Sequence, residues 1–245
     1  MPRSPQKVED AVSLAIITPT RKRWPWLAKQ AAALAPQLRD DDRWVIVVDN
    51  DQPDEQAVDR ITRLVGAERL LWAMLSYLRS RVPAGCVNRC HNLGVALASA
   101  EADLVEFDDH DLAEPHALDE IRLALANGYD YVFGAYRQQA VLVGPQSREY
   151  LETWPDVRHA YVRGGFERGE IDAIGPRGIR RSLWNSLGGW DANFWPCGDK
   201  DFAVRAERAG AAIACLDLPL ATVTIEPDSL SAAYRGQAPQ EVRKT

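Results

Sequence analysis

Short apolar runs alternate with amphipathic segments along the first half of this 245-residue chain. Compact apolar runs rich in β-branched residues are typical of buried strands, and apolar positions at helical spacing are typical of helices. We therefore expect strands over 13–18, 43–49, 70–76, 103–107 and 129–136. We expect helices over 24–38, 57–65, 88–100 and 115–126. This alternation indicates βαβ units and a mainly parallel sheet flanked by helices, an α/β fold.

The pattern is less regular in the second half. The stretch 138–178 is rich in glycine, arginine and aromatic residues and has no clean period, so it predicts a hairpin or a mobile loop. Regular structure returns over 180–190, followed by a helix over 199–209 and strands over 212–216 and 221–225. We expect a loose polar leader at 1–11, a single domain over 12–234 and a polar tail at 235–245.

Composition narrows the function classes. Hydrophobic residues make up 46% of the chain, which is typical of a globular protein, and the formal net charge is -6. An acidic balance argues against stable nucleic-acid binding. The chain shows neither the apolar core of a signal peptide nor an apolar run long enough to span a membrane, so we expect a cytoplasmic protein. The four cysteines form no CxxC pair and predict reduced thiols, with a zinc site as the alternative.

An acidic cluster follows the predicted strand 103–107. Asp108, Asp109, His110 and Asp111 place three carboxylates within four residues, and these charges repel one another. Parallel sheets bind ligands at the carboxyl ends of their strands, where Mg²⁺ or Mn²⁺ commonly bridges carboxylates to substrate phosphates. The cluster is therefore interpreted as a cation site. The alternative is a solvated turn that caps the next helix.

Three other segments carry candidate chemistry, each with a structural alternative. Asp199 starts a predicted helix, where it is either an N-terminal cap or a general base. Arg89 lies near another helix N-terminus and would hold a phosphate there, whereas the neighbouring His91 is interpreted as a packed or surface residue. The basic run Thr20-Arg21-Lys22-Arg23 is either a solvated turn or a diphosphate contact.

Taken in order, these segments resemble the inverting GT-A glycosyltransferases of family 2. The resemblance covers about residues 13–232, and no single motif is decisive. It rests on the order and spacing of LAIITPTRKR, VIVVDNDQPD, Asn92-Leu93-Gly94, VEFDDHDLAEP and LGGWDANFWPCGDKDFAVRAERAG. The resemblance implies a GT-A fold with a Rossmann-like central sheet, a nucleotide-binding half at about 12–112 and an acceptor and catalytic half at about 113–234.

The resemblance also implies an activity and a set of site residues. The chain would transfer a sugar from a nucleotide-diphosphate sugar, most often UDP-linked, to an acceptor hydroxyl with inversion, assisted by Mn²⁺ or Mg²⁺. Asp199 would be the catalytic base. Donor contacts would come from Thr18, Pro19, Thr20, Arg21, Asp49, Asn50, Arg89, Asn92, Asp108 and Asp109. Metal ligands would be Asp109, His110, Asp111 and Glu226. The acceptor is not specified, and a homo-oligomer is possible.

Several positions depart from the family pattern. Counting back from Pro115 places Asp108 and His110 at the two acidic positions of the DxD motif, whereas Asp109 and Asp111 form the rival register. Glu226 stands where a histidine is usual, and Gly198 stands where an acid precedes the catalytic one. These departures keep a non-catalytic binding module of the same fold as an alternative. A sugar nucleotidyltransferase is a further alternative, although no glycine-rich loop follows the first strand.

Two interpretations of the tryptophans remain. Trp154, Trp184, Trp190 and Trp195 lie in or near the predicted acceptor half. They would either stack on sugar faces or pack in the core, and for any one of them core packing is favoured.

Overall fold

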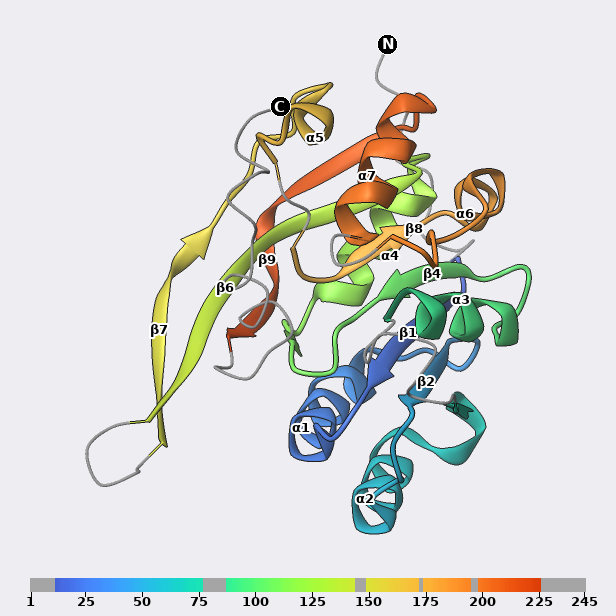
Figure 1. Ribbon diagram of the computed structural model, residues 1–245, viewed down its shortest axis with the longest axis vertical. Helices are drawn as coiled ribbons and strands as arrows, with labels where there is room; N and C mark the ends of the chain where they lie inside the picture. Colours follow the sequence, from blue (N-terminus) through green and yellow to red (C-terminus); the bar gives the residue numbers. More distant parts are fainter. Residues whose placement is uncertain (1–11, 77–86, 144–148, 172–173, 195–197, 226–245) are drawn as a thin grey trace.

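The structure, a computed structural model, describes residues 12–76, 87–143, 149–171, 174–194 and 198–225. Nine strands of this part of the chain form one sheet, in the order β3-β2-β1-β4-β8-β6-β9-β5, and β7 pairs with β6 (Figure 1). The strands are β1 (Leu14–Thr20), β2 (Arg43–Asp49), β3 (Leu70–Leu75), β4 (Asp103–Glu106), β5 (Leu112–Ala113), β6 (Tyr131–Val143), β7 (Glu149–Val157), β8 (Arg177–Ile179) and β9 (Ile213–Ile225).

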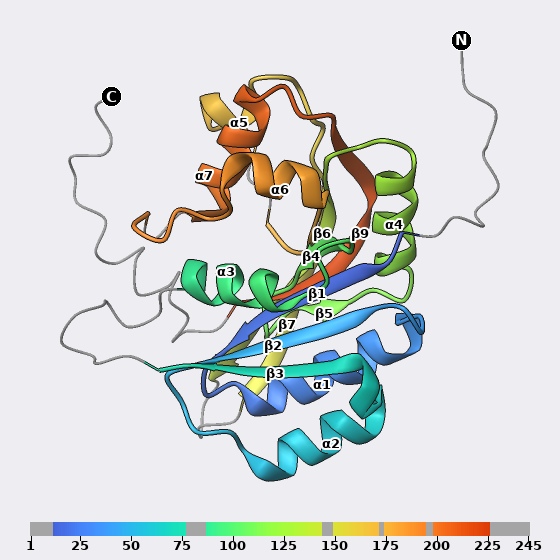
Figure 2. The ribbon, with the colours of Figure 1, turned by 90° about the vertical axis from the view of Figure 1, so that its right-hand side faces the viewer.

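Helices cover both faces of the sheet (Figure 2). They are α1 (Trp24–Leu34), α2 (Glu55–Val65), α3 (Val87–Leu97), α4 (Ala117–Ala126), α5 (Gly165–Arg168), α6 (Arg181–Leu187) and α7 (Gly198–Arg208), with 3₁₀ turns at Ala35–Gln37 and Ala67–Arg69. Apolar residues of α1, α2 and α4 form one buried cluster with β1 and β2. Residues of α3, α5, α6 and α7 form a second cluster on the opposite face. No helix among the described residues is long and apolar enough to cross a membrane.

The first half of the sheet is parallel, as the sequence predicts. β2 pairs in parallel with β1 and β3, and β1 pairs in parallel with β4. The second half adds antiparallel neighbours, because β8 lies antiparallel between β4 and β6. β6 and β9 are again parallel to each other. The predicted α/β class is confirmed, and β8 is the element that joins the two halves of the sheet.

The irregular stretch 138–178 contains the predicted hairpin. β6 and β7 form a long antiparallel ribbon that extends away from the sheet, at the lower left of Figure 1. The two strands predicted over 212–216 and 221–225 are one strand, β9. Pro219 lies between them, and the register with β6 shifts beside its partner Ala135. A local irregularity of this kind lets a strand continue past a residue that lacks an amide hydrogen.

The parallel half brings the candidate residues to one edge. In register, Thr20 of β1 lies opposite Val48 of β2, and Ile17 of β1 lies opposite Glu106 of β4. The ends of β1, β2 and β4 therefore place Thr20, Asp49 and the turn after Glu106 at the same carboxyl edge. This is the edge at which open α/β sheets bind their ligands.

Close packing of α3 on β1 gives a test of the fold. A Cβ on Gly94 would lie 2.5 Å from Ile17 Cγ2, because the helix backbone approaches the strand closely there. We expect Gly94→Ala to lower the free energy of unfolding by about 1–3 kcal/mol through overpacking. The measurement is urea unfolding.

Leu97 provides the matched control, because it lies on the exposed face of the same helix. Leu97→Ala should change the free energy of unfolding by no more than about 0.5 kcal/mol. Equal effects of the two substitutions would contradict the close α3–β1 contact.

Candidate active site

The acidic turn, residues Asp108 to Asp111, follows β4 and is fixed by α1. Gln30 is buried, and its amide Nε2 donates to the carbonyl oxygens of Asp108 at 2.6 Å and Asp111 at 3.1 Å. The side chains of Asp109 and Asp111 are buried. The turn is therefore not the solvated loop that the alternative reading required, because its backbone and two of its carboxylates are enclosed by the fold.

A cation from the basic run after β1 lies against this turn. Arg23 Nη1 is 3.2 Å from Asp109 Oδ1 and 3.1 Å from His110 Nδ1. His110 Nδ1 is also 3.2 Å from Asp109 Oδ1, and its Nε2 is 4.0 Å from Asp111 Oδ1. The imidazole thus lies between the two carboxylates. The basic run is more than a solvated turn, since one of its members binds the acidic cluster.

Burial and the charges of neighbouring groups strongly shift the pKa values of the residues in the acidic turn. Burial raises the pKa of Asp111 to about 7, although the charge of His110 lowers it. Burial disfavours the charged form of His110, but the hydrogen bond to Asp109 and the charges of Asp111 and Asp108 raise its pKa to about 9. Burial also raises the pKa of Asp108, yet the charges of His110, Arg177 and other cations bring it below its usual value. Such shifts are typical of functional sites.

The turn fits a hard cation that shares its coordination with a phosphate. Asp111 Oδ1 is buried and, within the described residues, has no hydrogen-bond partner, so it is available to a cation. No group of three or more His, Cys, Asp or Glu in the described ranges is arranged to hold a metal by itself. Cations bound through one or two carboxylates usually complete their shell with water and substrate phosphate.

The other predicted ligands differ in availability. Asp109 and His110 would have to release Arg23 before they bound a metal through the atoms it now contacts. Glu226 lies outside the described residues. The assignment of individual metal ligands stays a prediction.

The residues predicted for the nucleobase lie together at the ends of β1 and β2. Asp49 and Thr20 are buried, and the Thr20 hydroxyl has no hydrogen-bond partner among the described residues. Thr18 Oγ1 accepts a hydrogen bond from the indole of Trp44 at 2.9 Å, so this hydroxyl serves the core. Asn50 has a positive φ of 45°, which turns the chain sharply after β2.

The remaining residues predicted to contact the nucleotide-sugar donor are more scattered. Pro19 lies within β1 between the two threonines, and Arg21 is half-buried directly after this strand. Arg89 is exposed on α3. Asn92 Nδ2 donates to the carbonyl of Trp190 at 2.8 Å, and its Oδ1 accepts the Trp190 amide at 3.0 Å. Asn92 therefore ties α3 to the segment before α7, and its donor contact stays a prediction.

Asp199 lies in the first turn of α7, about half exposed. Its Oδ1 accepts a hydrogen bond from the Lys200 amide at 2.8 Å, and its Oδ2 is 3.6 Å from Arg177 Nη1. The preceding Gly198 is packed against Asn88, because a Cβ there would lie 2.4 Å from the Asn88 amide. Both roles proposed for Asp199 remain open to it, since Oδ1 accepts one helix amide and Oδ2 makes no amide contact among the described interactions.

A buried polar group beneath Asp199 is not predicted from the sequence. Glu106 and Arg177 are buried cross-strand partners on β4 and β8, with Arg177 Nε 3.4 Å from Glu106 Oε2. The indole of Trp190 donates to Glu106 Oε1, and the Trp190 ring stacks on His91 with centroids 5.2 Å apart. The one local signal is Glu106 itself, a charge within an apolar strand that demands a buried partner.

This group is also electrostatically unusual. Burial raises the pKa of Glu106 to about 7 against the lowering effects of Arg177 and Trp190. Burial lowers the pKa of His91 to about 3, so this histidine is neutral and packed. Trp184 and Trp190 are 6% and 4% exposed, which assigns them to the core rather than to an open sugar platform. The side chain of Trp154 and all of Trp195 lie outside the described residues.

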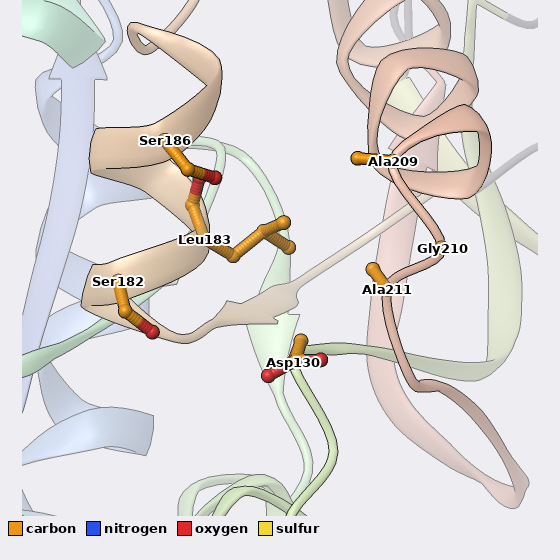
Figure 3. A pocket seen from close by; sticks show the side chains of 7 residues that line it. All are labelled: Asp130, Ser182, Leu183, Ser186, Ala209, Gly210 and Ala211. Carbon is orange, nitrogen blue, oxygen red and sulfur yellow. The ribbon is translucent and has the colours of Figure 1, made fainter.

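An open pocket at the opposite edge of the sheet has no part in this site. Figure 3 shows it lined by Asp130, Ser182, Leu183, Ser186, Ala209, Gly210 and Ala211. Asp130 precedes β6 and Ala211 precedes β9, so the pocket lies at the amino ends of these strands. The carboxylate of Asp130 is used within the fold, because it accepts the Ala212 amide and pairs with Arg180.

Solved structures share this fold. S. aureus TarS 1–349 matches with a TM-score of 0.63 and 13% identity, over 86% of this chain and 60% of that chain. The complex of TarS 1–349 with UDP-GlcNAc matches with a TM-score of 0.63 and 13% identity, over 87% of this chain and 58% of that chain. The mannosyltransferase PcManGT from Pyrobaculum calidifontis, in complex with GDP-Man and Mn²⁺, matches with a TM-score of 0.59 and 15% identity, over 92% and 60%.

These comparisons establish the fold. The neighbours are GT-A glycosyltransferases, and the predicted GT-A fold with its Rossmann-like sheet is confirmed. The chain spans about 60% of the length of the TarS 1–349 and PcManGT chains that it matches. No protein-family model and no curated protein matches the sequence.

The charge of His110 should appear in the pH dependence of stability. Its pKa is raised from 6.5 to about 9 in the folded chain, so its stabilising effect is complete below about pH 6.5 and is lost as the pH rises through about 9. We expect Tm to fall between about pH 7.5 and 9.5, and His110→Asn to flatten this fall. Glu106 and Asp111, with pKa values of about 7, contribute mainly below this window.

His116 supplies the control for this measurement. It lies outside the acidic turn, and its Nε2 is 3.0 Å from the Pro219 carbonyl. His116→Asn should keep the slope of the unaltered protein. An unchanged slope in His110→Asn would show that Asp109 and Asp111 do not hold the imidazole charged.

Proposed function

We propose that this chain is a glycosyltransferase that moves a sugar from a nucleoside-diphosphate sugar, UDP-linked, to an acceptor hydroxyl with inversion, assisted by a divalent cation. The observation that carries the proposal is the position of two kinds of carboxylate at one site. The acidic turn after β4 suits the donor diphosphate, and Asp199 is linked to the end of the same strand through Arg177, which pairs with Glu106. The GT-A fold and neighbours solved with UDP-GlcNAc and GDP-Man support it.

The donor nucleotide would lie along the carboxyl ends of β1 and β2. The unpartnered hydroxyl of Thr20 and the buried carboxylate of Asp49 are positioned to recognise a nucleobase. Arg21 and Arg23 follow β1 and would face the negative diphosphate, as guanidinium groups commonly do.

The cation would be held by Asp108 and Asp111 at the acidic turn. When bound, it supplies positive charge that stabilises the departing diphosphate. Arg23 keeps Asp109 oriented beside these ligands, Asp109 in turn accepts a hydrogen bond from His110, and Gln30 fixes the backbone of the turn. Rigid supports of this kind are needed because small displacements of charged groups are costly in catalysis.

Asp199 would accept the proton of the acceptor hydroxyl. Its carboxylate is about half exposed and so reaches a bound acceptor, while its partners Lys200 and Arg177 lie on the protein side. Removal of the proton as the hydroxyl attacks the anomeric carbon produces a single displacement and therefore inversion. The acceptor itself would bind on the side of α7 and the β6–β7 ribbon.

The role of Asp199 is tested by its isosteric amide. Asp199→Asn removes the base but keeps the size of the side chain, so turnover should fall by at least about 100-fold while nucleotide binding persists. The measurement is the rate of nucleoside diphosphate release at saturating donor.

Asp201 offers a matched control two residues further along α7. Its carboxylate binds Arg205 at 2.8 Å within the same helix and does not contact Arg177 in any described interaction. Asp201→Asn should change turnover less than about threefold, as expected for a substitution outside the reacting groups. Full turnover in Asp199→Asn would remove Asp199 from the mechanism.

Donor and cation binding are tested by thermal shift with UDP, GDP and TDP, each with and without Mn²⁺. Ligands that bind only the folded chain raise Tm with concentration, and UDP with Mn²⁺ should produce the largest rise. Asp111→Asn should abolish the additional rise due to Mn²⁺, whereas the exposed Asp119→Asn should retain it. A Tm that none of these nucleotides raises would contradict the proposed donor site, and nucleotide binding without turnover would indicate a binding module.

A further inference from the structure

The buried Arg177 contacts both Asp199 and the strand that leads into the acidic turn. Arg177 on β8 is 4% exposed, with Nε 3.4 Å from Glu106 Oε2 and Nη1 3.6 Å from Asp199 Oδ2. Glu106 is the last residue of β4, directly before the segment that leads into the acidic turn. One guanidinium therefore contacts both the strand that carries the acidic turn and the helix that carries Asp199.

The guanidinium is fixed in place by its surroundings. Arg177 and Glu106 are direct cross-strand partners in the β4–β8 pairing, so backbone register places their side chains together. The ring of Trp190 lies 5.5 Å from the guanidinium carbon, and the Trp190 indole donates to Glu106. The guanidinium is therefore enclosed by the Glu106 carboxylate, at ion-pair rather than hydrogen-bond geometry, and by the aromatic face of Trp190, and both limit its rotation.

Asp199 has no comparable support of its own. Its side chain is 43% exposed, and its Oδ1 is bound only by the amide of the next residue among the contacts of the described residues. The separation of 3.6 Å between Asp199 Oδ2 and Arg177 Nη1 is an ion-pair contact rather than a hydrogen bond, and its attraction favours side-chain rotamers that keep Oδ2 beside the guanidinium.

We propose that Arg177 is a positioning residue that orients the Asp199 carboxylate toward the acceptor, with Glu106 and Trp190 holding the guanidinium in place. This inference rests on the proposed function, because it gives Asp199 the role of base. It adds a residue that acts through Asp199 and contacts no reacting atom itself.

Energetics favour a role beyond stability. A buried ion pair commonly contributes little net stability, because desolvation of both charges offsets their attraction, and an apolar pair of similar size often serves the fold as well. The guanidinium here also approaches a third group, the Asp199 carboxylate on α7, which lies outside the β4–β8 strand pair. A pair retained only for folding would not require that contact.

The experiment is a double-mutant cycle on nucleoside diphosphate release from UDP-GlcNAc and GDP-mannose with Mn²⁺, with water as the acceptor. Arg177→Gln should lower kcat by about 10- to 100-fold, the effect of a misplaced catalytic group, and change the donor KM by less than about threefold. Arg177→Lys should recover part of kcat. In an Asp199→Asn background, Arg177→Gln should change kcat by less than about threefold, because the residue acts only through Asp199.

Two further variants separate orientation from folding. Glu106→Gln combined with Arg177→Gln removes both buried charges, so the chain keeps no unpaired charge and should fold. It should still show the loss of kcat. The exposed Arg168, which pairs with Glu170, is the control for loss of an arginine, and Arg168→Gln should leave kcat unchanged.

Each outcome decides the role of Arg177. If the unaltered chain is active, any of three results would overturn the positioning role of Arg177. They are full kcat in Arg177→Gln, restored kcat when Glu106→Gln is combined with Arg177→Gln, and multiplicative losses of kcat when Arg177→Gln is combined with Asp199→Asn. An unaltered chain that releases no nucleotide from either donor would instead overturn the proposed function, and the role of Arg177 with it.

Discussion

The antiparallel pairing of β8 with β4 is the constraint on which the candidate site depends. The parallel half of the sheet delivers the acidic turn, and the second half delivers α7 with Asp199. Among the strands that the structure describes, only β8 hydrogen-bonds to both β4 and β6, so it fixes the distance between these halves. A shift of β8 by one residue would turn Arg177 to the other face and remove its contact with Glu106. Correct register here is therefore a condition for the site.

A second level of support comes from α3. Asn88 Nδ2 donates to the carbonyls of Asp191 and Phe194 at 2.8 and 2.7 Å, and Asn92 binds both backbone groups of Trp190. These amides hold the segment before α7 from its backbone, independently of the side chains that project from it. The start of α7 is thus held by backbone contacts with α3 and by the approach of Arg177 on β8 to Asp199. This support depends on small residues in the segment, because a Cβ on Gly189 or Gly198 would press against Asn92 or Asn88.

The sequence predicts the parts of the fold and of the candidate site that depend on local patterns of residues. β1, β2 and most helices follow from apolar runs and helical spacing, and the acidic turn follows from its repelling charges at a strand end. The three-residue β8 escapes this approach, because a strand so short has no measurable period. The pair of Glu106 and Arg177 escapes it because their contact joins positions far apart in the chain. The sequence predicts two strands where the structure has the single strand β9, because Pro219 ordinarily interrupts a strand. A register shift between β6 and β9 beside Pro219 lets the strand continue.

Two buried ion pairs in the core differ in what their charges contact. Arg122 and Asp42 also form a buried pair, and there the carboxylate additionally accepts the amides of Leu14 and Arg39, so every contact serves the fold. Glu106 and Arg177 differ, because the guanidinium extends to a half-exposed carboxylate at the edge where ligands bind. Both pairs incur the cost of desolvation. In the pair of Arg122 and Asp42, backbone hydrogen bonds to the carboxylate offset this cost. In the pair of Glu106 and Arg177, the guanidinium instead extends toward an exposed carboxylate, and this difference is the physical basis for giving Arg177 a role in function.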